Sequence, residues 1–241
     1  KILKTDYTVS LNEPQQMVAD AQEIKDRGFE VIKVKLGNDP DKDIFRIKAI
    51  RRQIGNEIPL RLDANQGWNA DSAIRVLNEL ADLNIQFCEE PIPRWNYMEL
   101  PRIRKASNVM IMADESCCDH HDAQRLIDLG AALSFNIKLG KSSGIFKAQK
   151  IIKLAEIANL QLQIGGFLES RIGFTASAHL ALTSNTVKFC DFDTPMMFSE
   201  DPVSGGISYG NNGLITLSEL PGLGAYLEPS YLKKLTSFTI R

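Results

Sequence analysis

Hydrophobic and polar positions alternate along the chain between short β-rich runs and longer segments of helical period. The apolar runs typical of strands are residues 6–11, 31–36, 60–62, 85–88, 109–113, 133–139, 160–164 and 187–190. The amphipathic segments between them are residues 14–27, 41–53, 70–83, 119–129, 144–158 and 173–182. Strand and helix in repeated order predict parallel strands joined by helical crossovers.

Successive runs carry a charged residue or a glycine at or near their C-terminal ends, at intervals of 24 to 28 residues. These residues are Lys35, Asp63, Glu89, Asp114, Lys138, Gly165 and Asp191. An open doubly wound sheet brings polar strand ends together only near its switch point. A closed (β/α)₈-type barrel gathers all its strand ends at one mouth, where such barrels carry their catalytic residues. The period therefore favours an α/β fold of the TIM-barrel type over the open sheet.

Residues 1–193 form the predicted barrel domain, and its last strand is followed by turn-rich sequence instead of an obvious helix. Residues 194–241 are rich in proline and glycine, which predicts turns and a short hairpin within residues 204–213. We expect this C-terminal segment to leave the barrel and to pack as a separate unit.

Charge and composition exclude several partners. The 28 basic and 30 acidic residues give a net charge of −2, which leaves no electrostatic footprint for nucleic acid or an anionic membrane surface. No uncharged stretch approaches the roughly 20 apolar residues that span a bilayer, and the first residues do not read as a signal peptide. Four scattered cysteines predict reduced thiols and a cytoplasmic protein. Assembly into a homo-oligomer stays open.

Three acids, Asp63, Glu89 and Asp114, end three consecutive predicted strands. Neighbouring strands lie about 4.8 Å apart, so these side chains can converge on one point, where unpaired carboxylates would repel one another. A divalent cation removes this repulsion, and carboxylates without a nearby Cys or His favour Mg²⁺ over zinc. We therefore predict a Mg²⁺ site, although a single strand-end acid would more simply be a helix cap or a solvated charge.

Lys35 and Lys138 stand one strand before and one strand after these acids, so they flank the predicted metal from opposite sides. Lys33 points to the same face as Lys35, and two neighbouring ammonium groups lower each other's pKa, which suits Lys35 to act as a neutral general base. A metal with a lysine on each side suits removal of an α-proton and return of another to the opposite face, with Lys33 supporting the enolate. The alternative is that the lysines only balance the acids.

Five ordered motifs carry a resemblance to a known family. They are Lys33-Val-Lys35, Asp63-Ala-Asn65, Glu89-Glu-Pro91, Ala113-Asp-Glu-Ser116 and Asn136-Ile-Lys138. Together they resemble the barrel motifs of the enolase superfamily, muconate-lactonizing subgroup, over nearly the whole chain. The resemblance implies a modified (β/α)₇β barrel, Mg²⁺ on the three acids, and acid/base roles for Lys35 and Lys138. Members carry an N-terminal α+β capping domain that is absent from these residues, and residues 194–241 are expected to pack on the barrel and on that domain.

The last predicted strand resembles a narrower group. Asp191-Phe-Asp193 is similar to the Asp-x-Asp signature of dipeptide epimerases, whose carboxylates hold the α-ammonium of the substrate. The segment from Gly165 to Ser170 is similar to the strand-seven region, where glycines let a substrate approach the backbone, so Gly165 and Phe167 are candidate substrate-binding residues.

The resemblance implies an isomerase, a Mg²⁺-dependent dipeptide epimerase. It would invert the α-carbon of the second residue of an L,L- or L,D-dipeptide by two-base, Lys/Lys 1,1-proton transfer through a metal-stabilised enolate. An N-acylamino acid racemase, an o-succinylbenzoate synthase or a cycloisomerase of the same superfamily stays open. A non-catalytic, degenerate metal-binding barrel is the alternative outside enzymology. Neither the side-chain specificity nor the lysine that serves each stereoisomer follows from the sequence.

Overall fold

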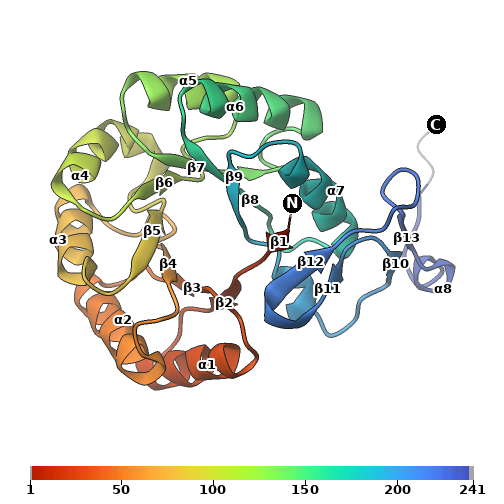
Figure 1. Ribbon diagram of the computed structural model, residues 1–241, viewed down its shortest axis with the longest axis horizontal. Coiled ribbons are helices and arrows are strands. Elements are labelled where there is room, and N and C mark those ends of the chain that lie inside the picture. The colour runs from red at the N-terminus through yellow and green to blue at the C-terminus, as the bar shows by residue number, and fades with distance from the viewer. Residues whose placement is uncertain (1, 239–241) are drawn as a thin grey trace.

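The computed structural model describes residues 2–238 and contains a ring of parallel strands surrounded by helices (Figure 1). The strands of the ring are β2 Tyr7–Val9, β3 Ile32–Lys35, β4 Leu60–Asp63, β5 Ile85–Glu89, β6 Ile111–Ala113, β7 Ser134–Lys138, β8 Gln161–Gly165 and β9 Val187–Cys190. They hydrogen-bond in chain order, and Thr5 forms a parallel bridge with Cys190 that brings the first and last strands together. The predicted TIM-barrel type of fold is therefore confirmed.

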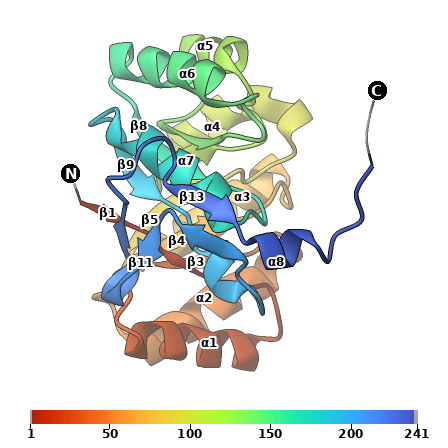
Figure 2. The same ribbon diagram turned by 90° about the vertical axis from the view of Figure 1, so that its right-hand side faces the viewer.

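Helices fill the crossovers on the outside of the ring (Figures 1 and 2). They are α1 Pro14–Asp26, α2 Pro40–Ile54, α3 Ala70–Leu80, α4 Leu100–Ala106, α5 His120–Asp128, α6 Ile145–Ile157 and α7 Arg171–Leu182. The short 3₁₀ turn η2 Thr194–Met197 follows β9, so within residues 2–238 the arrangement is (β/α)₇β, as predicted. None of the described helices combines the length and apolar character needed to cross a membrane.

The crossover from β5 to β6 differs from the sequence prediction, which placed no helix there. It contains the 3₁₀ turn η1 Arg94–Glu99 and then α4. Prolines obscured this helix, but Pro101 lies in its first turn, where the missing N–H has no helical partner. Leu100 and Ile103, three residues apart on one face, are buried. A short helix therefore forms because its apolar face has a core to cover.

Strand register determines which side chains enter the ring. Lys35 pairs with Asp63 across β3 and β4, and Asp63 pairs with Glu89 across β4 and β5. Because side chains alternate along a strand, Val34 is buried in the hydrophobic core while Lys33 and Lys35 face the inside of the ring. The register therefore brings charged residues of neighbouring strands to one end of the barrel.

The loop after β3 is fixed by a close approach and by a buried carboxylate. Gly37 has a φ of 109°, and a Cβ at this position would lie 1.9 Å from the carbonyl oxygen of Ala64. Asp43 of α2 accepts hydrogen bonds from the Gly37 N–H at 2.9 Å and from Trp68 Nε1 at 3.0 Å. Asp43 also pairs with Arg46 Nη1 at 2.9 Å, so its buried charge is compensated. This network holds the loop beside Lys35.

The C-terminal segment forms two small antiparallel sheets beside the ring. The elements of this segment are β10 Val203–Gly205, β11 Ser208–Tyr209, η3 Asn211–Gly213, β12 Leu214–Thr216, β13 Ala225–Leu227 and α8 Pro229–Leu232. The strand β1 Leu3–Lys4, near the N-terminus, joins one of the two sheets. β11 and β12 form a hairpin a few residues later than the one expected within residues 204–213, and β1 pairs with β12. β10 pairs with β13.

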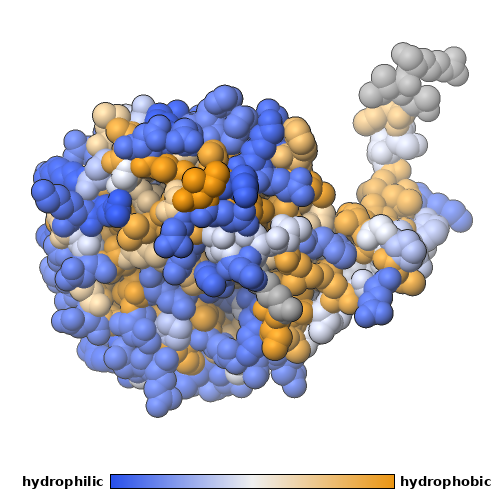
Figure 3. Space-filling view, turned by 45° about the horizontal axis from the view of Figure 1, so that its top comes forward, coloured by the Kyte–Doolittle hydropathy of each residue, from blue (hydrophilic) through white to orange (hydrophobic). Residues whose placement is uncertain are grey.

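This segment is tied to the barrel by hydrogen bonds. The Tyr209 hydroxyl donates to the Phe192 carbonyl at 2.6 Å, and Arg171 of α7 donates to the Ile207 carbonyl at 2.9 Å. Hydrophobic residues gather on the part that projects from the barrel (Figure 3), and Leu220 and Tyr226 of the C-terminal segment are exposed. The division into domains at residue 193, and a further packing partner, stay predictions.

Candidate active site

A cavity of about 610 Å³ lies at the C-terminal ends of the ring strands, and we call it the mouth cavity. Lys33 and Lys35 reach it from β3, and Lys138 reaches it from β7. In the described sheet β3 and β7 are the second and sixth of eight strands, so the two strands face each other across the ring. Asp191 and Asp193 also line the cavity. It is therefore the candidate active site, at the end where barrel enzymes carry theirs.

The first two predicted metal ligands are held by lysines of β3. Asp63 and Glu89 are fully buried. Lys33 Nζ lies 3.0 Å from Asp63 Oδ2 and 3.0 Å from Glu89 Oε2, and Lys35 Nζ lies 2.7 Å from Asp63 Oδ2. Asn136 of β7 donates to Glu89 Oε1 at 2.7 Å. The two acids thus share a compact polar site beneath the mouth cavity.

The third predicted ligand, Asp114, follows β6 and is paired with lysines from the next strand and its turn. Lys138 Nζ lies 2.7 Å from Asp114 Oδ2, and Lys141 donates to Asp114 Oδ1 and to its carbonyl. Burial would raise the pKa of Asp114, but the two ammonium groups outweigh burial and lower it. Asp114 is therefore a carboxylate at neutral pH.

The donor chemistry of these three acids fits Mg²⁺. Their described side-chain partners are lysines and the amides of Asn136 and Gln163, without sulfur or imidazole, and hard cations prefer such oxygen ligands. Glu89 lies between Asp63 and Asp114 in strand order, so the acids are neighbours at one side of the ring. In the structure Lys33 pairs with Asp63 and Glu89, and Lys138 pairs with Asp114. The assignment of this trio as metal ligands stays a prediction.

The charge state of the lysines departs from the sequence argument. Burial would lower the pKa of Lys33, but Asp191 and the acids at the ends of β4 and β5 raise it well above its usual value. For Lys138, burial likewise lowers the pKa, while Asp114 and Glu89 raise it above its usual value. The expectation that neighbouring ammonium groups depress each other's pKa is therefore wrong for Lys33, because nearby carboxylates dominate.

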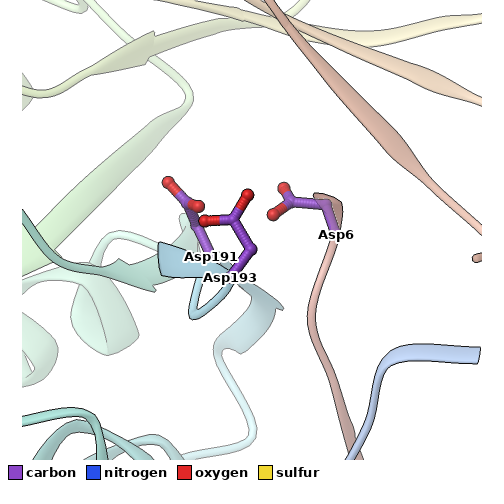
Figure 4. A group of neighbouring side chains, drawn as sticks. All are labelled: Asp6, Asp191 and Asp193. Carbon is purple, nitrogen blue, oxygen red and sulfur yellow. The ribbon is translucent and has the colours of Figure 1, made fainter. Parts of the chain in front are cut away.

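A second group of acids stands on the other side of the ring, where the barrel closes (Figure 4). Asp191 and Asp193 follow β9, and Asp6 directly precedes β2. One carboxylate oxygen from each of the three lies within 4.8 Å of the other two, and all three residues are buried. Lys33 Nζ lies 2.8 Å from Asp191 Oδ2, and Arg61 Nη1 lies 2.7 Å from Asp6 Oδ2.

The two aspartates predicted to bind substrate differ in charge. Burial would raise the pKa of Asp191, but Lys33 lowers it to about 2. Burial and the neighbouring Asp191 raise the pKa of Asp193 to about 7, although Thr8 N–H donates to Asp193 Oδ2 at 2.7 Å. Asp191 is thus an anion at neutral pH, whereas Asp193 is close to half protonated at pH 7.

Of the two other predicted substrate-binding residues, Phe167 lines the mouth cavity and Gly165 does not. Lys138 Nζ lies 5.1 Å from the ring centroid of Phe167, within reach of a cation–π contact. A Cβ on Gly165 would lie 2.8 Å from Asn136 Oδ1, so this glycine makes room for the amide that holds Glu89. In the described chain it is the next residue, Gly166, that faces the cavity.

Sequence reasoning missed several residues of the site. Glu90 is buried and accepts hydrogen bonds from Asp114 N at 2.7 Å and Ser116 N at 3.2 Å, so it fixes the turn that carries Asp114. Burial raises the pKa of Glu90 to about 7. The Glu89-Glu90 doublet was a signal, since one of two successive side chains faces away from the ring. Lys141 and Asp6 gave no comparable signal.

A family model, "Enolase C-terminal domain-like", matches residues 16–231. The D-Ala-D/L-Ala epimerase of Cytophaga hutchinsonii is 54% identical to the chain over 240 residues, which cover 100% of this chain and 65% of that protein. The chain therefore spans about two thirds of the length of this curated relative.

Solved structures with this fold include close matches. A Cytophaga hutchinsonii dipeptide epimerase, complexed with Mg and D-Ala-L-Val, has a TM-score of 0.97 and 55% identity, covering 98% of this chain and 64% of that chain. A substrate-liganded L-Ala-D/L-Glu epimerase of Bacillus subtilis has a TM-score of 0.91 and 38% identity, and the match covers 93% of this chain and 63% of that chain. An N-succinyl Arg/Lys racemase of Bacillus cereus has a TM-score of 0.93 and 30% identity, and the match covers 98% of this chain and 64% of that chain.

Proposed function

The chain belongs to the enolase C-terminal domain-like family, and from that premise we propose that the complete protein is a Mg²⁺-dependent dipeptide epimerase. The observation that carries the proposal is the placement of Lys35 and Lys138 on opposite sides of one cavity, with buried carboxylates between their strands. Similar proteins from Cytophaga and Bacillus are epimerases of dipeptides, which supports this substrate class. The proposed reaction inverts the α-carbon of the second residue of an L,L- or L,D-dipeptide.

Strand order supports one orientation of the dipeptide. Glu89 ends the fourth strand of the described ring and Asp191 follows the eighth, so the two groups of acids lie on opposite sides. We place the terminal carboxylate of the substrate toward the acids of β4 to β6, and its ammonium toward Asp191 and Asp193. The second α-carbon then lies between Lys35 and Lys138. The opposite orientation would bring the substrate carboxylate against Asp191, an anion at neutral pH.

Proton transfer is the difficult step. An unassisted α-proton lies roughly 10 pK units above a lysine ammonium, about 14 kcal/mol at about 1.36 kcal/mol per unit. Mg²⁺ held by the three acids would supply Lewis-acid stabilisation of the charge that develops on the substrate carboxylate. Lys33, within 3.0 Å of two of these acids, adds a fixed positive charge near the same place. One flanking lysine removes the proton at its neutral Nζ, and the opposite lysine donates one to the other face.

The buried trio of Asp6, Asp191 and Asp193 resembles a cation site as well. Lys33 and Arg61 already pair with two of these acids in the described structure. The remaining charge matches a monovalent ammonium better than a divalent metal. We therefore propose that this side of the cavity receives the amino terminus of the dipeptide, and that Mg²⁺ belongs on the opposite side.

The test is an exchange screen of the complete protein, loaded with Mg²⁺, in D₂O. A dipeptide library and its N-acetylated counterparts are incubated, and deuterium incorporation and stereochemistry are followed by mass spectrometry and chiral separation. An epimerase incorporates one deuterium at the second α-carbon and yields both isomers. Equal exchange with the amino group blocked would favour an N-acylamino acid racemase. A product with an unsaturated bond would favour a lyase of the o-succinylbenzoate synthase type, and no exchange would favour a non-catalytic barrel.

A further inference from the structure

Asp6 stands between two cavities. Asp191 and Asp193 line the mouth cavity, whereas Asp6 lines a separate cavity of about 290 Å³ that also contacts Arg61. Asp6 directly precedes β2 and Arg61 is the second residue of β4, so this floor cavity lies where the strands begin. The carboxylate of Asp6 is nevertheless within 4.8 Å of the other two, toward which it points in Figure 4. Asp6 therefore joins the mouth cavity to the floor of the barrel.

The three carboxylates have too few cations around them. Lys33 pairs with Asp191 but is shared with two acids across the ring, and Arg61 pairs with Asp6 Oδ2. Asp6 Oδ1 is buried and has no hydrogen-bond partner within residues 2–238. Asp193, in the same described part of the chain, pairs with no lysine or arginine. Buried acids in this situation retain a proton, because desolvation and mutual repulsion disfavour full ionisation.

The titratable and charged groups that face Asp6 and Asp193 from the surrounding elements are consistent with a retained proton. Within the described chain they include Asp191 after β9, Lys33 of β3, Arg61 of β4 and Tyr209 of β11. Tyr209 donates to the Phe192 carbonyl, and burial raises its pKa, so it remains neutral. Burial, followed by Asp191, raises the pKa of Asp6 well above its usual value, as it does for Asp193.

We propose that Asp6 is a positioning residue that makes substrate binding an exchange of one proton for the ammonium of the dipeptide. In the free protein the proton resides on Asp193 or Asp6. When the ammonium reaches Asp191 and Asp193, this proton leaves to solvent and the ammonium takes over its charge. The floor cavity gives the proton a route from Asp6 that a substrate in the mouth does not cover. The inference rests on the proposed function, since it requires a free amino terminus.

Isothermal titration calorimetry of the complete, Mg²⁺-loaded protein tests the exchange, with L-Ala-L-Val as the probe. Titrations in phosphate, PIPES and imidazole at one pH separate the heat of buffer protonation from the heat of binding. For a group with a pKa of about 7 and a dipeptide amine with a pKa of about 7.7–8.0, we expect net release of about 0.7 proton per dipeptide at pH 6.5 and almost none at pH 7.5, where the amine takes up a proton as it binds. Binding with the same heat in all three buffers at pH 6.5 would overturn the proposal.

The Asp6→Asn variant tests the residue itself. It removes one of the three neighbouring carboxylates and therefore part of the repulsion that retains the proton, so we expect proton release at pH 6.5 to fall to less than about half of the wild-type value. The KM of this variant should also lose its pH dependence between pH 6 and 8, while kcat keeps the wild-type pH profile. Undiminished proton release in Asp6→Asn would remove Asp6 from the mechanism.

Two further variants complete the design. Asp6→Glu keeps the carboxylate, so it should retain most of the proton release and replaces Asp6→Asn as the deciding variant if the latter does not fold. Glu30→Gln is the matched control, because Glu30 lines the same floor cavity but pairs with Lys4 outside the acidic cluster. Loss of release in Glu30→Gln would argue against a specific role of Asp6. If L-Ala-L-Val does not bind, or its N-acetylated form binds equally well, the proposed function itself fails, and this inference fails with it.

Discussion

Replacing both Asp191 and Asp193 by Asn tests the proposed ammonium site most directly. The substitution preserves side-chain volume and removes both carboxyl groups that would contact the substrate ammonium at the wall of the mouth cavity. Lys33 does not become an unpaired buried cation, because its Nζ keeps two carboxylates at 3.0 Å. We therefore expect the double variant to fold, so that a loss of activity reports on substrate binding.

The magnitude follows from the hydrogen bonds that the ammonium would lose. Each charge-assisted hydrogen bond contributes about 1.5–3 kcal/mol, so two contribute about 3–6 kcal/mol. At about 1.4 kcal/mol per factor of ten, kcat/KM should fall by roughly 10²–10⁴-fold. The single variants should be unequal. The pKa of Asp191 is about 2 and that of Asp193 about 7, so Asp191→Asn should be the more damaging substitution at pH 6.5.

The assay is the initial rate of deuterium incorporation with free and N-acetylated dipeptides. A matched control is the double variant Asp20→Asn and Asp26→Asn, which makes the same two side-chain changes on α1, where each aspartate accepts a hydrogen bond from a glutamine. We expect the control to retain wild-type rates. A loss smaller than tenfold at the mouth cavity, or an equal loss for free and blocked dipeptides, would refute the ammonium assignment.

Three other substitutions test separate parts of the structure. Lys138→Ala should lower epimerisation by at least about 10²-fold, while Lys35 still exchanges the α-proton of one isomer in D₂O; interconversion of both isomers at the wild-type rate would rule out the two-base scheme. Asp114→Ala should weaken Mg²⁺ binding in calorimetry, and undiminished affinity would exclude this ligand. Asp43→Ala removes the carboxylate paired with the buried Arg46, so urea unfolding should show a loss of about 3–5 kcal/mol, and a loss below about 1 kcal/mol would contradict the buried network.

The fold could be predicted because strand-end chemistry repeats at the length of one βα unit. The period located β3 to β9, and alternation placed Lys33 and Lys35 on the inner face, where the structure has them. Segments with short or proline-interrupted patterns were less informative. α4 was missed because Pro101 lies within it, although proline is tolerated in the first turn of a helix.

The site could be predicted only as far as strand order determines it. Order alone puts the acids of β4, β5 and β6 side by side, with Lys35 and Lys138 on either side of them. Lys141 was missed because it lies in the turn after β7, where no periodicity applies, yet it donates to Asp114. The pKa of Lys33 was also misjudged. Along the sequence its charged neighbour is Lys35, whereas the acids that raise its pKa, such as Asp191 and Asp63, come from other strands.

Asp6 shows most clearly what the linear pattern lacks. It looks like the polar start of an ordinary strand, and 185 residues separate it from Asp191. Closure of the ring through the Thr5–Cys190 bridge brings the two carboxylates together, and the same closure lets Arg61 of β4 reach Asp6 from across the floor. The proton balance of the proposed ammonium site therefore depends on the contact between the first and last strands. Substitutions that loosen this contact should change the pH dependence of dipeptide binding before they change the chemistry of the lysines.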